Sequence, residues 1–205
     1  MEPVIDVSGL TKSFDGKRVV DDVALKVGKG QIYGFLGPNG SGKSTLLQTI
    51  AGAIAPSEGT AAYNKESKTE TENAYQYISI AAPYLEVIEE MTATEFLEFH
   101  ASFKPLLQTV TIKQILEIIG LQAATGKQIR FYSSGMKQRL KLAQAFFSNT
   151  PILLLDEPTT NLDADGIALY HHLIDNYTSG KLIIVSSNDT QEYDFCGEVI
   201  KIGEY

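Results

Sequence analysis

The sequence has a single cysteine, Cys196, has no tryptophan, and contains no long apolar run. One cysteine cannot form an internal disulfide, so the sequence favours a reducing compartment. No stretch reaches the roughly 18 consecutive apolar residues that indicate a membrane-spanning helix. Residues 1–6 also lack the basic and then apolar order of a signal peptide. We therefore expect a cytoplasmic protein without a membrane-spanning segment of its own.

Basic residues are scarce as well: 17 Lys and Arg stand against 25 Asp and Glu, which gives a formal net charge of −8. Proteins that bind nucleic acid without sequence preference need basic side chains to neutralise phosphates, and polybasic membrane anchors need a similar excess. The composition therefore predicts no nucleic-acid partner. Because 43% of the residues are hydrophobic and 20% are charged, it does predict a folded domain with a sizeable core.

Short apolar runs alternate with helical patterns along most of the chain. Four runs have the length and composition of strands buried in a parallel sheet, namely 32–36, 78–82, 152–155 and 182–185. Residues 4–7 and 19–27 have polar-interrupted β patterns on either side of the turn Asp15-Gly16, which predicts an antiparallel β layer. Residues from about 92 to 127 are helical in pattern throughout and predict a small helical lobe. This alternation favours an α/β fold.

One octapeptide carries a specific motif, because it matches G-x-x-x-x-G-K-[ST] at every fixed position: Gly37-Pro38-Asn39-Gly40-Ser41-Gly42-Lys43-Ser44. The glycines let successive backbone N–H groups point at phosphates, and the helix expected from Thr45 onward adds its positive N-terminal end. We expect Lys43 to reach the β- and γ-phosphates and the Ser44 hydroxyl to coordinate Mg²⁺. The motif predicts that the chain binds a nucleoside triphosphate.

Two carboxylates, Asp156 and Glu157, directly follow the apolar run 152–155. The carboxyl ends of parallel strands are where α/β folds place their ligands. We expect Asp156 to hold Mg²⁺ through the water shell of the metal, since Mg²⁺ keeps several waters. Glu157 is expected to orient or deprotonate the attacking water.

Residues 132–139, Tyr-Ser-Ser-Gly-Met-Lys-Gln-Arg, resemble L-S-G-G-Q-Q-Q-R, the signature of the nucleotide-binding subunits of ABC (ATP-binding cassette) transporters. Residues 160–163 resemble the D-loop of that family, and Phe14 resembles the aromatic residue that stacks on adenine. The resemblance implies one cassette domain over 1–205. Its fold would be a P-loop NTPase core with a mainly parallel sheet, an N-terminal antiparallel β layer and a small helical lobe.

The signature also suits an anion on physical grounds, because Ser133, Ser134 and Gly135 precede a helix predicted at 136–147 and offer hydroxyl and N–H groups there. In the family, this segment binds the γ-phosphate of an ATP held by a partner cassette, and Asp163 of the D-loop is assigned to the same nucleotide site. The resemblance implies a homodimer with two buried ATP molecules. It also implies a separate membrane permease, which would hold the protein at the inner face of the membrane.

Several positions depart from the family pattern. Ser134 and Met136 replace a glycine and a glutamine of the signature. Asn188 follows the run 182–185 where the family has a histidine, and no glutamine follows 78–80, where the family has its Q-loop. Asparagine donates a neutral hydrogen bond but cannot carry a positive charge. Because the loss of one such contact in a reactive site costs about a hundredfold in rate, we predict slow hydrolysis.

Two functions fit these features. The first is an ATPase subunit that powers a membrane transporter by ATP-driven closure of a dimer. The second is a nucleotide-gated regulatory cassette in a membrane complex with little or no turnover, which the missing histidine and glutamine favour. The presence of Lys43, Asp156 and Glu157 argues against a site that cannot hydrolyse ATP at all.

Overall fold

The computed structural model describes residues 4–28, 30–63 and 71–202 and divides the chain into two compact units. The first unit is built from the segments 1–80, 150–157 and 180–205, and the second from 81–149 and 158–179. Each unit has its own buried apolar residues. The phosphate loop belongs to the first unit, and the signature segment belongs to the second.

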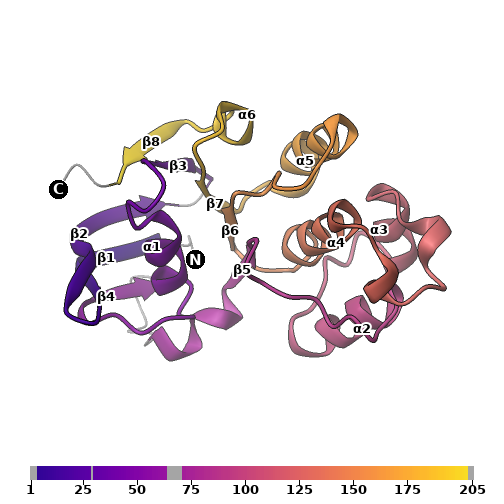
Figure 1. Ribbon diagram of the computed structural model, residues 1–205, viewed down its shortest axis with the longest axis horizontal. Helices are drawn as coiled ribbons and strands as arrows, with labels where there is room; N and C mark the ends of the chain where they lie inside the picture. Colours follow the sequence, from indigo (N-terminus) through magenta and orange to yellow (C-terminus); the bar gives the residue numbers. More distant parts are fainter. Residues whose placement is uncertain (1–3, 29, 64–70, 203–205) are drawn as a thin grey trace. The chain divides into compact units, whose positions relative to one another are not determined.

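Two sheets make up most of the first unit (Figure 1). The antiparallel sheet has the order β2-β1-β4 and consists of β1 (Val4–Phe14), β2 (Lys17–Gly28) and β4 (Glu58–Tyr63). The other sheet has the order β5-β6-β7-β3-β8, with β3 (Ile32–Leu36), β5 (Ile78–Ala81), β6 (Ile152–Asp156), β7 (Leu182–Ser186) and β8 (Glu198–Lys201). Strands β6, β7, β3 and β8 pair in parallel. The predicted α/β fold with an N-terminal antiparallel layer is confirmed.

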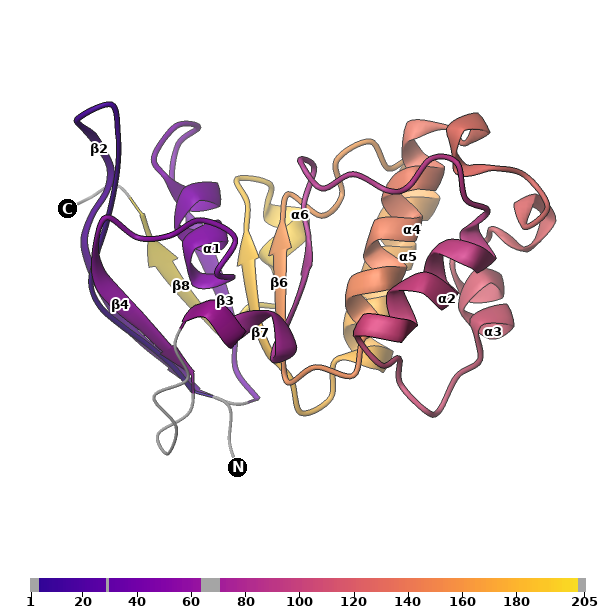
Figure 2. The ribbon, with the colours of Figure 1, turned by 90° about the horizontal axis from the view of Figure 1, so that it is seen from below.

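Helix α1 (Lys43–Ile50) lies between these two sheets, as both ribbon views show (Figures 1 and 2). Its Leu46, Leu47 and Ile50 are fully buried. They share one core cluster with residues of β1 and β2 and with alternate residues of β6 and β7, namely Ile152, Leu154, Leu182 and Ile184. The short helices α6 (Thr190–Tyr193) and η1 (Thr71–Gln76) complete this unit. The core therefore fixes α1 against one face of the parallel strands.

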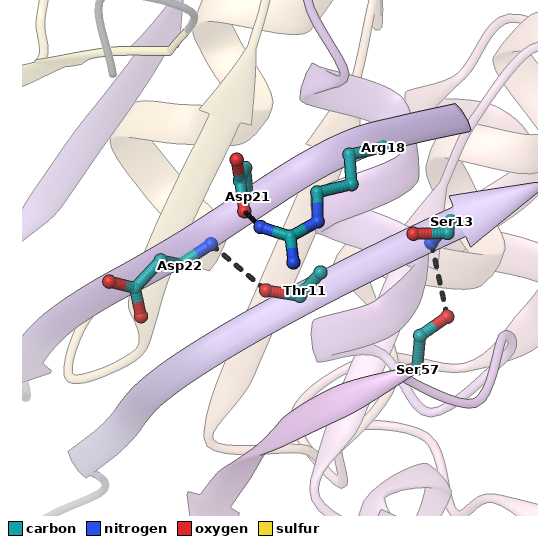
Figure 3. A network of polar contacts seen from close by, with 6 residues as sticks. All are labelled: Thr11, Ser13, Arg18, Asp21, Asp22 and Ser57. Carbon is teal, nitrogen blue, oxygen red and sulfur yellow. Dashed lines mark hydrogen bonds and ion pairs between the residues drawn. The ribbon is translucent and has the colours of Figure 1, made fainter. Parts of the chain in front are cut away.

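The antiparallel layer is irregular where β1 approaches its end, because its pairing with β2 shifts register there. Asp22 adopts φ 46° and donates its N–H to Thr11 Oγ1 at 3.0 Å (Figure 3). The N–H of Ser13 donates to Ser57 Oγ at 3.1 Å, which ties β1 to the segment before β4 (Figure 3). Bulges of this kind increase the local twist of a strand pair. These contacts hold the end of β1, from which Phe14 extends.

The second unit is helical and contains α2 (Ala93–Phe103), α3 (Ile112–Ile118), α4 (Ser134–Phe146) and α5 (Ala164–Tyr177), with the single turns η2 (Gln122–Ala124) and η3 (Ile129–Phe131) (Figure 2). Thr92 and Glu95 form a capping box at the start of α2. Helices α4 and α5 pack through edge-to-face rings, with Phe146 and Tyr170 centroids 6.3 Å apart.

The helical segment predicted at 92–127 holds α2, α3 and η2, but the prediction that it is helical throughout is wrong for residues 104–111, 119–121 and 125–127. Lys104 is extended, with φ −139° and ψ 106°. Pro105 explains the break, because proline disfavours a helical conformation in the residue before it and lacks an N–H of its own. The second unit also takes in α4 and α5, so it is larger than the expected lobe.

Candidate functional site

The phosphate loop leads from the end of β3 to the first residue of α1, the strand–loop–helix order that the motif requires. Gly40 and Gly42 have φ values of 83° and 93°, in a region that residues other than glycine rarely adopt. A Cβ atom at Gly42 would lie 2.4 Å from the carbonyl oxygen of Val19, and one at Gly37 would lie 2.3 Å from that of Ile202. The glycines are therefore needed both for the loop conformation and for its close packing.

The loop encloses a pocket of about 240 Å³, which is lined by Val19, Asn39, Gly40, Gly42, Lys43, Ser44, Thr45 and Glu157. Lys43 Nζ donates to the carbonyl oxygens of Gly37 at 2.6 Å and Pro38 at 3.2 Å, so its ammonium group lies against the loop. No side chain caps the N-terminus of α1, and its first turn contains no acidic residue. An ammonium group beside the positive end of a helix favours an anionic ligand.

The acidic strand end lies in the same unit as the loop. Asp156 is the last residue of β6, is 2% exposed, and has an Oδ1 atom without a hydrogen-bond partner. A buried carboxylate oxygen is costly unless a donor or a cation satisfies it. Mg²⁺ binds through few protein oxygens, its own waters and substrate phosphates, so this oxygen and the Ser44 hydroxyl fit the metal. Within the described residues, no three His, Cys, Asp or Glu side chains cluster as an independent metal site.

Glu157 has a constrained backbone. Its φ is 42°, in the left-handed region, and its N–H donates to the carbonyl oxygen of Ser186 at 2.9 Å. Residues other than glycine that are held in such strained conformations cluster at functional sites. The side chain lines the phosphate-loop pocket, so the structure brings it together with Lys43 and Ser44.

Asn188 follows β7 and contacts the phosphate loop directly, because its Nδ2 donates to Asn39 Oδ1 at 2.7 Å. The residue at the position of the family histidine is thus beside the pocket, although it does not itself line it. Sequence reasoning did not identify Asn39 as its partner.

Phe14 ends β1 and exposes 45% of its surface, with Lys12 Nζ 5.0 Å from its ring centroid. An exposed ring at a strand end suits the stacking of a flat base. Phe14 does not line the pocket around the loop, whereas Val19 of β2 does. Val19 was not predicted from the sequence as a site residue, because it belongs to none of the motifs.

The signature segment lies in the second unit and forms a pocket of about 310 Å³, which is lined by Ser133, Ser134, Gly135, Met136, Arg139, Asn161 and Asp163. Ser133 is the N-cap of α4, and its hydroxyl accepts from the Met136 N–H at 3.2 Å. The helix begins at Ser134 rather than at 136, so Ser134 and Gly135 belong to its first turn. Their N–H groups therefore keep the orientation of a helix N-terminus.

The D-loop residue Asp163 joins the same pocket through two contacts. It caps α5 by accepting from the Gly166 N–H at 2.9 Å, and Arg139 of α4 pairs with its Oδ1 at 3.2 Å. The hydrogen bond from Gly166 and, to a smaller extent, Arg139 lower the pKa of the Asp163 carboxyl. Asn161, with φ 66°, and Arg139 lie within the D-loop and signature segments, but they were not predicted as site residues.

A phosphate loop between β3 and α1, with a buried carboxylate at the end of β6, defines a P-loop nucleotide-binding protein. A model of the family described as ABC transporter matches residues 20–160. The chain belongs to this family. In the described part of the chain, no helix has both the length and the apolar character needed to cross a membrane.

Similar proteins include the uncharacterized ABC transporter ATP-binding protein YcbN of Bacillus subtilis, which is 31% identical over 98% of this chain and 67% of that protein. The bacitracin transport ATP-binding protein BcrA of Bacillus licheniformis is 33% identical over 95% of this chain and 64% of its own length. A solved dimer of an ATP-binding cassette in a post-hydrolysis state, bound to ADP and Pi, has the same fold, with a TM-score of 0.82 and 22% identity over 97% of this chain and 94% of that one.

Proposed function

We propose that this chain is the ATP-binding and ATP-hydrolysing subunit of a membrane ABC transporter. The observation that carries the proposal is the pocket in which Lys43, Ser44 and Glu157 meet beneath an uncapped helix N-terminus. Such a pocket selects a phosphate chain, since backbone N–H groups, the helix dipole and an ammonium group all favour negative charge. Phe14 is proposed to stack on the adenine, which would make ATP the nucleotide.

The metal site is proposed to consist of the Ser44 hydroxyl and the buried Asp156 carboxylate, whose Oδ1 lacks a partner in the fold. Bound Mg²⁺ would neutralise charge on the β- and γ-phosphates. Glu157 then holds the attacking water by its carboxylate, in a position that its left-handed backbone and the bond to Ser186 fix. Asn188 provides a neutral donor near the γ-phosphate end of the site.

The second pocket supports a proposal of dimerisation. Ser133, Ser134 and Gly135 present a hydroxyl and N–H groups at the start of α4, which is a second anion site in a chain with one phosphate loop. We assign this site, together with Asp163, to the γ-phosphate of an ATP held by a second copy. Two copies related by a two-fold axis would bury two ATP molecules.

Hydrolysis is proposed to be slow. The Asn188 amide is neutral and already donates to Asn39, and no glutamine follows β5, where the chain continues with Ala82 and Pro83. A separate permease is the proposed membrane partner, and it would hold the chain at the inner face of the membrane. The name of the relative BcrA, a bacitracin transport ATP-binding protein, supports a transport role. The substrate would be set by the permease.

A regulatory cassette is the second candidate, and the same two departures favour it. The experiment that separates the candidates measures ATP turnover of the purified chain beside the ATP-dependent mass in solution of the Glu157→Gln variant. A transporter ATPase should turn over ATP and, as Glu157→Gln, form a stable ATP dimer. Dimer formation without measurable turnover in the parent chain would favour the regulator, and failure of both chains to bind ATP would overturn both proposals.

A further inference from the structure

In the described residues, three buried side-chain oxygen atoms have no hydrogen-bond partner: Ser41 Oγ, Asp156 Oδ1 and Ser186 Oγ. All three belong to the first unit, and each lies in the phosphate loop or at the carboxyl end of a parallel strand. A buried oxygen without a partner destabilises a fold, so native proteins keep very few. Ser41 and Asp156 belong to the nucleotide site already described. The hydroxyl of Ser186 has no assigned role.

Ser186 and Asp156 are direct neighbours across the sheet. They are paired residues in the parallel register of β7 and β6, where both are the last residues of their strands. Side chains alternate along each strand, and the residues two and four positions earlier pack in the core cluster with α1: Ile152, Leu154, Leu182 and Ile184. Asp156 and Ser186 therefore project from the face that α1 covers, in the direction of the phosphate loop.

The main chain of Ser186 is already engaged, because its carbonyl oxygen accepts from the Glu157 N–H at 2.9 Å. Its hydroxyl is not engaged, although the side chain is 0% exposed. The two unpartnered oxygens on adjacent strands do not bond to each other. A single small donor located between them would satisfy both, and a water molecule has the two hydrogens that this requires.

We propose that Ser186 is an additional residue of the metal site, where its hydroxyl accepts a hydrogen bond from a water of the Mg²⁺ shell that also donates to Asp156. This rests on the proposed binding of ATP with Mg²⁺. Ser186 is a positioning residue, since it contacts the metal only through water. Groups at this distance from a metal fix its ligands and commonly change metal affinity by about 10- to 100-fold.

The test compares the parent chain with two variants, Ser186→Ala and Ser79→Ala. Ser79 is the matched control, since it is a buried serine in the same sheet, 2% exposed, whose hydroxyl donates to the Ile152 carbonyl and accepts from Thr150. ATP affinity is measured with Mg²⁺ and with EDTA, and the ratio of the two affinities gives the contribution of the metal. Thermal unfolding in EDTA without nucleotide gives the contribution to the fold.

Ser186→Ala should lower the affinity ratio by about tenfold or more, leave ATP binding in EDTA unchanged, and unfold at a temperature no lower than the parent chain. Ser79→Ala should keep the parent ratio and unfold at a lower temperature.

An unchanged ratio for Ser186→Ala, or a parent affinity that does not depend on Mg²⁺, would overturn the assignment. A lower unfolding temperature for Ser186→Ala in EDTA would overturn it too, because the hydroxyl would then be bonded within the metal-free fold. Failure of the parent chain to bind ATP under either condition would instead refute the proposed function.

Discussion

The side-chain amide of Asn188 donates a 2.7 Å hydrogen bond to Asn39, and so joins the segment after β7 to the phosphate loop. A neutral donor stabilises the developing charge of a phosphoryl-transfer reaction less than a charged one does, because charge-assisted hydrogen bonds are roughly twice as strong. The pair gives a physical reason for the proposed slow hydrolysis that is separate from nucleotide binding. It also makes turnover the property that a substitution at Asn188 should change.

Asn188→His should raise kcat by about tenfold or more, since loss of one such donor in comparable sites costs about 10²- to 10³-fold. Steady-state phosphate release checks this, with ATP affinity under non-hydrolysing conditions as the control that should not change. Asn188→Ala should lower kcat further. Equal rates in all three chains would contradict a role for this side chain.

The second prediction concerns Gly42, where a Cβ atom would lie 2.4 Å from the Val19 carbonyl oxygen. Gly42→Ala should displace the loop from β2, abolish measurable ATP binding and lower the unfolding temperature. Gly180→Ala is the matched control, because Gly180 has φ 76° but nothing within 4 Å of its Cβ position. Gly180→Ala should lower the free energy of unfolding only by the backbone strain, about 1 kcal/mol, and should keep ATP binding. ATP titration and thermal unfolding of both variants measure the difference.

The phosphate loop could be predicted from sequence because its geometry tolerates few residues. Only glycine fits position 42, because of its positive φ and the close approach of the Val19 carbonyl oxygen. The spacing of the glycines in the motif therefore follows from the geometry of the loop. The contact of Asn188 with Asn39 could not be predicted, since it joins residues 149 positions apart. The same holds for Val19 in the pocket and for the pairing of Arg139 with Asp163, which depend on how strands and helices pack.

Two strands were missed for local reasons. Strand β4 begins Glu58-Gly59-Thr60, and glycine in a strand interior carries no side chain to bury, so the segment has weak hydrophobic alternation. Strand β8 is the edge strand of its sheet and carries Glu198 and Lys201, while Val199 is 48% exposed. Edge strands are often short and charged because this prevents pairing with other chains. Both strands depend on their neighbours in the sheet more than on their own sequence pattern.

The third prediction concerns pH. His100 is largely buried, and its Nε2 lies 2.8 Å from Ser148 Oγ. Burial, and to a smaller extent nearby Lys104, lower the pKa of His100 to about 4 from its ordinary 6.5. The unfolded chain therefore takes up a proton first, so the free energy of unfolding should fall as pH decreases from about 6.5 to about 4, and this contribution should level off below that. Urea unfolding at several pH values should show a smaller decrease for His100→Gln, and an identical pH dependence would contradict the assignment.

The fourth prediction separates the two roles of Ser133, which caps α4 and lines the signature pocket. Ser133→Ala removes the cap and should lower the free energy of unfolding by about 1 kcal/mol. Ser133→Asp should keep a cap, since aspartate is as good an N-cap as serine, and so preserve stability.

The carboxylate of Ser133→Asp would nevertheless repel a phosphate at this helix end. In a Glu157→Gln background, Ser133→Asp should therefore bind ATP normally but remain monomeric in sedimentation, while Ser133→Ala should still dimerise in part. A stable ATP dimer of the Ser133→Asp chain would mean that the signature pocket does not receive a phosphate of the partner.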